Sequence, residues 1–191
     1  MKQGGKIRII GGLWKRTPLP VLDSEGLRPT GDRQRETIFN WLTHLFDGDF
    51  SQKRSLDMFA GTGALSFEMA SRGADCVVVL EKNRAAAKLI EQSKEKLHAD
   101  NMHIIYGDSL KDSEAEELGP YDIIFIDPPF ALHLQEKAIK KALSLLDSGG
   151  LIYVESPTEI TDDFLDPLGL TAVKRAKGGA SHLLVAQKSE I

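Results

Sequence analysis

The fold is decided by the stretch Leu56-Asp57-Met58-Phe59-Ala60-Gly61-Thr62-Gly63-Ala64. Its apolar start is typical of a buried strand, and the two glycines that follow predict a tight turn into a helix. Glycine lacks a Cβ atom, so a turn of this composition lets a large cofactor lie directly against the main chain. We therefore expect a ligand-binding strand–turn–helix unit at the start of an α/β domain.

Downstream of this unit, apolar strands alternate with helices along the chain. Near-continuous apolar strands joined by helices are typical of a parallel sheet that is covered on both faces. We predict strands over 56–59, 76–80, 102–106, 121–126 and 151–155, helices over 64–71, 84–98 and 134–146 with a short acidic one near 114, and a closing pair over 170–175 and 183–187. The expected fold class is α/β, with a mostly parallel sheet, helices on both faces and a C-terminal antiparallel hairpin.

The first 50 residues show a different pattern, and we assign 1–50 to a small hairpin and helix extension and 51–191 to the main domain. Residues 7–10 and 13–16, separated by Gly11-Gly12, predict a hairpin, because glycine supplies the positive φ angles of a tight turn. The proline-containing stretch 17–32 predicts a connector. Helical spacing of the apolar residues from Ile38 to Phe46 then predicts a helix that ends at 47–49.

Composition and charge are those of a globular protein with a polarised charge distribution. The 191 residues are 41% hydrophobic and carry a net charge of −4, yet residues 1–30 hold six basic and two acidic side chains. That segment is about +4 and the remainder about −8, which suits a basic arm on an acidic body as well as a solvated terminus. The one cysteine, Cys76, leaves no internal disulfide and favours a reducing cytoplasm. No segment is apolar enough to predict a signal peptide or a membrane span.

Acidic residues follow successive predicted strands at the edge where the glycine turn lies. In open α/β sheets, ligands bind beyond the carboxyl ends of the strands. Glu81, about twenty residues after the turn, is placed to accept hydrogen bonds from both ribose hydroxyls of an adenosyl group, and Asp108 from an adenine amino group. These positions favour S-adenosylmethionine as the cofactor. The predicted binding residues are Asp57, Phe59, Gly61, Gly63, Glu81, Lys82, Asp108 and Ser109.

Two other ligand classes agree less well with the turn. A dinucleotide fingerprint needs a third glycine where Ser66 stands, and a phosphate-binding P-loop needs a lysine after the loop. The remaining alternative is an ordinary strand-to-helix turn that is bordered by surface acids and binds no ligand. The five histidines and Cys76 show no metal-ligand spacing, so no metal is expected.

The loop after the apolar strand 121–126 reads Asp127-Pro128-Pro129-Phe130. Its two prolines stiffen the backbone and remove two donors, so nearby carbonyls face outward as acceptors. Such acceptors can hold both hydrogens of an exocyclic amino group on a base and aim its lone pair at a sulfonium methyl. Asp127 would hold the amine, and Phe130 would stack on the extruded base, which is worth about 1–3 kcal/mol. We predict that these four residues form the catalytic loop of a methyl transfer.

With these motifs in view, residues 55–155 resemble a class I S-adenosylmethionine-dependent methyltransferase of Rossmann-like fold. The N-terminal block is more specific, since residues 8–12, Leu27-Arg28-Pro29-Thr30 and the run 32–42 resemble the RsmD family. That family methylates the exocyclic N2 of a guanine in bacterial 16S rRNA. The resemblance implies S-adenosylmethionine as donor and the small ribosomal subunit, or an assembly intermediate of it, as partner.

The resemblance also implies roles for residues in the N-terminal block. The family's Arg-Pro-Thr block packs by the cofactor and the RNA entrance, so Thr30 is expected at the cofactor and Arg33 and Arg35 at the RNA. Further RNA contacts, to phosphates, are expected from Arg8, Lys15, Arg16 and Arg28. The closing hairpin around 177–182 matches the family only loosely and receives no role.

Two alternatives remain open. An adenine-N6 methyltransferase acting on DNA or RNA would use a related Pro-Pro-aromatic loop, and a non-catalytic RNA-binding assembly factor would retain the same fold. The N-terminal block favours guanine, and the intact glycine turn and Pro-Pro loop favour catalysis. Nothing in the sequence demands a partner subunit, so a monomer is expected. Trp14 either stacks on a base or fastens the basic arm to the body.

Overall fold

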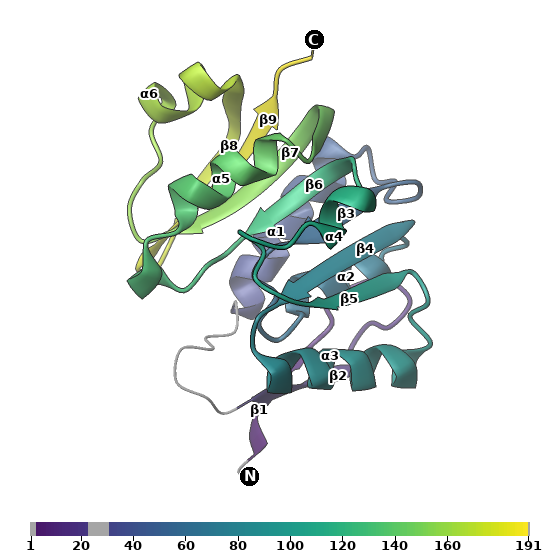
Figure 1. Ribbon diagram of the computed structural model, residues 1–191. Coiled ribbons are helices and arrows are strands. Elements are labelled where there is room, and N and C mark those ends of the chain that lie inside the picture. Colours follow the sequence, from purple (N-terminus) through teal and green to yellow (C-terminus); the bar gives the residue numbers. More distant parts are fainter. Residues whose placement is uncertain (1–2, 23–30, 191) are drawn as a thin grey trace.

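A seven-stranded sheet forms the centre of the computed structural model, which describes residues 3–22 and 31–190 (Figure 1). The strand order is β5-β4-β3-β6-β7-β9-β8. The strands from β5 to β7 are parallel, and β9 pairs antiparallel with both β7 and β8. The bounds are β3 (Arg54–Asp57), β4 (Cys76–Glu81), β5 (Met102–Tyr106), β6 (Tyr121–Ile126), β7 (Leu146–Ser156), β8 (Leu170–Gly178) and β9 (Ser181–Lys188).

Helices cover both faces of this sheet and enclose two apolar cores. Helices α1, α2 and α3 contribute to one core and α4, α5 and α6 to the other. In Figure 1, α5 lies in front of the sheet and the fainter α1 and α2 lie behind it. The bounds are α1 (Asp32–Leu45), α2 (Ala64–Ser71), α3 (Arg84–Leu97), α4 (Glu114–Glu117), α5 (Gln135–Leu143) and α6 (Asp162–Leu165), with short 3-10 turns η1 (Phe130–Leu132) and η2 (Asp166–Leu168). The Rossmann-like α/β fold with an antiparallel C-terminal pair is confirmed.

Strand β4 shows why these apolar runs become central strands. All six of its residues are buried. Side chains alternate along a strand, so Val77 and Val79 enter the core with α1 to α3 while Val78 and Leu80 enter the other. Full burial of one such side chain contributes about 1.5–3 kcal/mol. A run with no polar position is therefore stable only between two covering layers.

The N-terminal hairpin exists, but the sequence placed its strands wrongly. Strands β1 (Gln3–Arg8) and β2 (Pro18–Leu22) pair antiparallel, and residues 9–17 form the loop between them. The predicted strand 13–16 is part of that loop, and the predicted connector contains β2. Gly11-Gly12 does not serve as the hairpin's two-residue turn. Instead, Gly12 has φ +75° and lies so close to α2 that an added Cβ would be 2.0 Å from the Ser71 carbonyl oxygen.

The described residues before 51 share the core of the sheet. Phe39 of α1 contacts Phe50 and, on the sheet, Phe125 of β6, with ring centroids 6.4 and 6.2 Å apart. Trp14 is half-buried and packs against the same core, which fits its predicted role in fastening the arm. The division at residue 50 stays a prediction about sequence organisation.

Two further differences concern the middle and the end of the chain. The helix predicted over 134–146 ends at Leu143, and β7 begins at Leu146. Gly149, with φ +69°, lies inside β7 where the register with β6 shifts, which marks a bulge in that strand. None of the helices in the described part of the chain is both long and apolar enough to span a membrane.

Candidate active site

The strand order places the glycine turn and the Pro-Pro loop at neighbouring positions on one edge of the sheet. Strands β3 and β6 pair directly, with Asp57 beside Phe125. The turn at 60–63 follows β3, and Asp127 comes directly after Ile126, the last residue of β6. Because parallel strands end at the same edge, both loops leave the sheet side by side. This is also the point where strand order reverses, which is where open α/β sheets bind ligands.

The glycine turn is built from residues with left-handed backbone conformations. Gly61 has φ +57° and Gly63, the N-cap of α2, has φ +77°. An added Cβ on Gly63 would lie 3.1 Å from Cγ1 of Ile90 and 3.3 Å from the Phe67 ring. Glycine is therefore required at position 63 both for the conformation and for the close packing of α2 against α3.

Asp57, the buried last residue of β3, bonds to residues on either side of the turn. Its carboxylate accepts a hydrogen bond from the Ser66 hydroxyl at 2.8 Å and a long one from the Phe59 amide at 3.4 Å. Burial, only partly offset by these hydrogen bonds, raises the pKa of Asp57 to about 7. Ser66 thus has a structural use at the position where a dinucleotide fold would carry glycine. The structure assigns Asp57 a supporting role beneath the predicted cofactor site.

Glu81 ties the end of β4 to the glycine turn. Its Oε2 accepts a hydrogen bond from the Gly61 amide at 2.6 Å, and its Oε1 accepts one from the Asn83 amide at 2.7 Å. The side chain is almost fully buried, and burial raises the pKa of Glu81. Asn83 in turn caps α3 by accepting from the amides of Ala85 and Ala86. Sequence reasoning missed this cap, although asparagine before a helical run is a known start signal.

The other predicted cofactor residues follow the tips of β4 and β5. Asp108 is half-buried, accepts from the Leu110 amide at 3.1 Å, and lies 3.8 Å from the exposed Lys82 ammonium. Ser109 is buried and Phe59 is half-buried. Five residues that were not predicted join Gly61 around a small surface hollow: Pro20, Leu22, Thr62, Ala86 and Leu89.

These residues fit an adenosyl group by the chemistry of their side chains. Glu81 and Asp108 present carboxylate acceptors at neighbouring strand ends, which suit ribose hydroxyls and an adenine amine. The half-buried Phe59 adds apolar surface. Gly61, which lines the hollow, carries no side chain that would cover the main chain there. Thr30 lies outside the described residues.

The predicted catalytic loop leaves β6 at the adjacent position. Asp127 and Phe130 are half-buried, Pro128 is buried and Pro129 is exposed. The chain then turns at once into η1, because the amide of Leu132 donates to the Pro129 carbonyl at 3.1 Å. The loop is therefore anchored at both ends, by β6 and by η1, and its two prolines fix the backbone between them.

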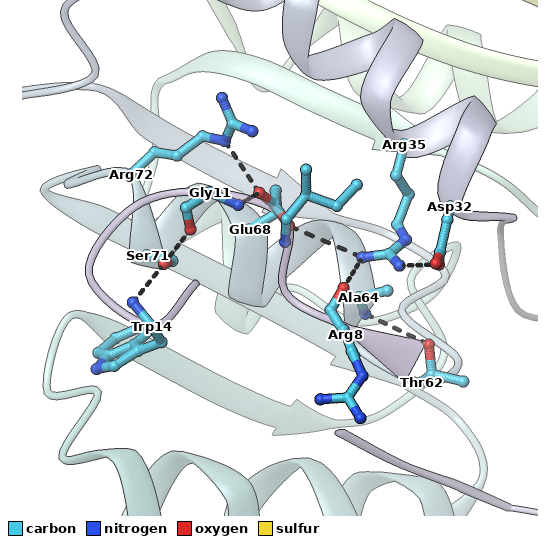
Figure 2. Close-up of polar contacts among 11 residues, drawn as sticks. Arg8, Gly11, Trp14, Asp32, Arg35, Thr62, Ala64, Glu68, Ser71 and Arg72 are labelled. Carbon is cyan, nitrogen blue, oxygen red and sulfur yellow. Dashed lines mark hydrogen bonds and ion pairs between the residues drawn. The ribbon is translucent and has the colours of Figure 1, made fainter. Parts of the chain in front are cut away.

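A buried charge network joins the N-terminal arm to α2 (Figure 2). Glu68 of α2 accepts hydrogen bonds from the amides of Ile10 and Gly11, at 2.9 and 2.7 Å, and from Nε of Arg72 at 3.0 Å. Arg35 lies 3.7 Å from the same carboxylate and donates to the Arg8 carbonyl at 2.9 Å. Both Glu68 and Arg35 are fully buried. The network fixes the arm and α1 to the helix that begins at the glycine turn.

The place of Arg35 in this network corrects one predicted RNA contact. Two other predicted contacts, Lys15 and Arg16, lie away from the active-site edge. A fully buried Arg35 cannot reach an RNA phosphate, so the structure assigns it to the core, where Asp32 and Glu68 neutralise it. Lys15 and Arg16 are exposed, but their loop is attached to the last residue of α2 through the bond from the Leu13 amide to the Ser71 carbonyl. That end of α2 lies about 12 Å from the glycine turn, by helical rise.

The remaining predicted RNA residues occupy two places. Arg8 is exposed and donates to the Arg16 carbonyl at 3.1 Å, so these two side chains belong to one basic surface. Arg33 is exposed on the first turn of α1. Arg28 lies outside the described residues.

Comparison with known proteins agrees with this geometry over nearly the whole chain. The family model described as Conserved hypothetical protein 95 matches residues 7–187. Ribosomal RNA small subunit methyltransferase D of Haemophilus influenzae is 39% identical over 180 residues, which covers 92% of this chain and 90% of that protein. The protein of the same name from Escherichia coli (strain K12) is 41% identical over 161 residues, covering 81% and 77%. The solved structure of Escherichia coli yhhF superposes with a TM-score of 0.83 at 35% identity, covering 98% of this chain and 100% of that one.

Proposed function

We infer that this chain, which belongs to the family described as Conserved hypothetical protein 95, the RsmD family, transfers a methyl group from S-adenosylmethionine to ribosomal RNA. Relatives that cover most of the chain carry the name ribosomal RNA small subunit methyltransferase D. We propose further that the acceptor is the exocyclic N2 of one guanine in the 16S rRNA, within the small subunit or an assembly intermediate of it.

One observation carries this proposal: the glycine turn and the Asp127 loop are neighbours on the sheet, because β3 and β6 pair directly. A methyl donor held at the first loop and an amine held at the second would meet without a long reach. Orientation of this kind supplies up to about 7–11 kcal/mol of a barrier in ideal cases. The donor's sulfonium provides a methyl on an excellent leaving group, so little further chemistry is needed from the protein.

The residues of the chain have separate tasks in this proposal. Glu81 and Asp108 would hold the adenosyl part of the donor. Asp127 and the carbonyls beside the prolines would accept hydrogen bonds from both N–H groups of the guanine amine. These bonds would direct the amine lone pair toward the methyl group of the donor. Asp127 would take the surplus proton after transfer. Phe130, at the start of η1, would stack on the extruded base and offset part of the cost of unstacking it.

The basic surface formed by Arg8, Lys15 and Arg16 would bind phosphates of the RNA at a distance from the reacting amine. Phosphate contacts orient a substrate without reading its sequence. A footprint that reaches from this surface to the catalytic loop would need a large folded RNA, which agrees with a subunit or an assembly intermediate as the substrate. The enzyme would act in the cytoplasm as a monomer.

The decisive experiment uses small subunits purified from cells that lack this protein. They are incubated with the enzyme and S-adenosylmethionine carrying a labelled methyl group, and the rRNA is digested to nucleosides. Label in N2-methylguanosine is the expected result. Label in N6-methyladenosine would instead support the adenine alternative, and absence of binding between the enzyme and S-adenosylhomocysteine in calorimetry would support a non-catalytic assembly factor.

A further inference from the structure

Three polar side chains lie behind the catalytic loop at the end of β7 and the start of β9, and the proposed reaction uses none of them. They are Tyr153, Glu155 and Ser181, with exposed fractions of 0%, 7% and 3%. This cluster could not be predicted from the sequence, because Tyr153 and Glu155 lie within an apolar strand and Ser181 lies in the closing hairpin.

Strand register brings the cluster next to Asp127. Strands β6 and β7 pair in parallel with Phe125 beside Tyr153 and Ile126 beside Val154. The next position along this register places Asp127 beside Glu155, and neighbouring strands are about 4.8 Å apart. Side chains alternate, so Phe125, Asp127 and their partners on β7 project from the same face. The contact of the Phe125 and Tyr153 rings, with centroids 6.1 Å apart, confirms the shared face.

Hydrogen bonding in the cluster is incomplete. The Ser181 hydroxyl donates to Oε1 of Glu155 at 2.7 Å and fixes that carboxylate from the β9 side. Within the described part of the chain, neither the Tyr153 hydroxyl nor Oε2 of Glu155 has a hydrogen-bond partner, although both atoms are buried. Buried polar groups without partners cost folding free energy, so their presence requires an explanation.

Tyr121, the other tyrosine with a fully buried side chain, shows the ordinary arrangement. It lies on β6, and its hydroxyl donates to the Ala115 carbonyl at 2.6 Å. Tyr121 belongs to the opposite core, at the end of β6 that is distant from the catalytic loop. The chain therefore contains one buried tyrosine that is satisfied by the fold and another whose hydroxyl is left over at the active-site edge.

The Tyr153 hydroxyl is a hydrogen-bond donor surrounded by negative charge. Burial raises the pKa of Tyr153 well above its usual value, and the charges of Glu155 and Asp127 and a hydrogen bond to Glu155 outside normal geometry raise it further. The phenol is therefore protonated at neutral pH. A neutral donor near two carboxylates can donate to either one, and because Ser181 occupies only Oε1 of Glu155, both Oε2 of Glu155 and the Asp127 carboxylate are candidate acceptors.

We propose that Tyr153 is a positioning residue for methyl transfer, whose hydroxyl donates to the Asp127 carboxylate when the target amine is bound and fixes that carboxylate toward the amine. The inference rests on the proposed function, because it needs Asp127 to hold the amine. Glu155, fixed by Ser181, forms the other wall of the cluster and keeps the hydroxyl turned toward this edge. In this proposal, the Tyr153 hydroxyl gains a hydrogen bond to Asp127 only when the target amine is bound.

The test compares Tyr153→Phe with Tyr121→Phe, which removes a buried hydroxyl of the same kind from the other core. We expect Tyr153→Phe to lower kcat on undermethylated small subunits by about tenfold, as for loss of one preorganised polar contact of moderate strength. The KM for S-adenosylmethionine and the affinity for S-adenosylhomocysteine should stay within about twofold. Its Tm should fall by less than that of Tyr121→Phe, because the Tyr153 hydroxyl makes no hydrogen bond of normal geometry in the folded protein.

Tyr121→Phe should show the reverse pattern, with a lower Tm and a wild-type kcat, since it loses the bond to the Ala115 carbonyl. An unchanged kcat in Tyr153→Phe would overturn the inference, and so would a lost cofactor affinity or a Tm as low as that of Tyr121→Phe. Wild-type protein is measured in the same assay. Absence of transfer by the wild type would refute the proposed function itself, whereas equal transfer by wild type and Tyr153→Phe would refute only the positioning role.

Discussion

The buried carboxyl group of Asp57 should make the stability of this protein fall as pH rises toward neutrality, and Asp57→Asn should remove that dependence. The pKa of Asp57 is raised from 3.8 to about 7, chiefly by burial. In the unfolded chain the group loses its proton near pH 4, whereas in the folded protein it keeps the proton up to about pH 7. Its contribution to stability is therefore fully present below pH 4 and is lost as pH rises through 7.

The size of the effect follows from the shift. One pKa unit corresponds to 1.36 kcal/mol, so a shift of about three units corresponds to about 4 kcal/mol. The asparagine side chain has nearly the same shape, and its carbonyl can still accept the Ser66 hydroxyl hydrogen bond. We expect the free energy of unfolding of the wild type, minus that of Asp57→Asn, to fall by about 4 kcal/mol between pH 4 and pH 7.5.

Urea denaturation of both proteins at several pH values measures this difference directly. Asp100→Asn, a change at an exposed carboxylate after α3, is the matched control and should change the free energy of unfolding by less than about 0.5 kcal/mol. A difference between wild type and Asp57→Asn that stays constant within about 1 kcal/mol over this range would show that Asp57 is not buried beneath the glycine turn.

Three further predictions concern the proposed reaction. Glu81→Ala should weaken binding of S-adenosylhomocysteine by roughly ten- to a hundredfold in calorimetry, because it removes the proposed ribose acceptors and the bond to the glycine turn. Glu95→Ala, at an exposed position on α3, serves as the control, and equal affinity in the two variants would contradict the assignment. Asp127→Ala should lower kcat by about 10²-fold while leaving that affinity unchanged; near-normal turnover would exclude Asp127 from the mechanism. Replacing Lys15 and Arg16 together by Ala should lower RNA affinity and also reduce its dependence on salt, measured by filter binding at several salt concentrations; if neither quantity moves, the basic loop does not contact RNA.

The central sheet could be predicted from the sequence because its strands satisfy one simple requirement. A strand covered on both faces has few polar positions, as in Val77-Val78-Val79, and such runs are recognisable without knowledge of their neighbours. The N-terminal hairpin could not be placed in this way. Gly11-Gly12 suggested a two-residue turn, whereas the structure uses Gly12 to bring the chain against the Ser71 carbonyl. A glycine required by a distant contact looks the same in sequence as a glycine required by a turn.

The candidate site was predictable in outline for a related reason. Residues that follow parallel strands must meet at one edge, so Gly61, Glu81 and Asp127 could be grouped from strand assignment alone. What each side chain contacts was not predictable, because that depends on which helix packs over it. Asp57 bonds to Ser66 of α2, and Glu81 bonds back to the turn. Sequence position identified both as site residues but could not show that one supports the turn from below.

Charged residues gave the least reliable predictions, and the short helix α2 explains why. Arg35 was expected on an RNA-binding surface, yet it is buried against Glu68, a residue that the sequence analysis did not select. Breaking a buried ion pair by removing one partner typically costs about 3–5 kcal/mol, so this pair holds the arm firmly. The same eight-residue helix begins at the glycine turn and ends where the arm is bound. The basic loop and the glycine turn are therefore attached to opposite ends of one helix.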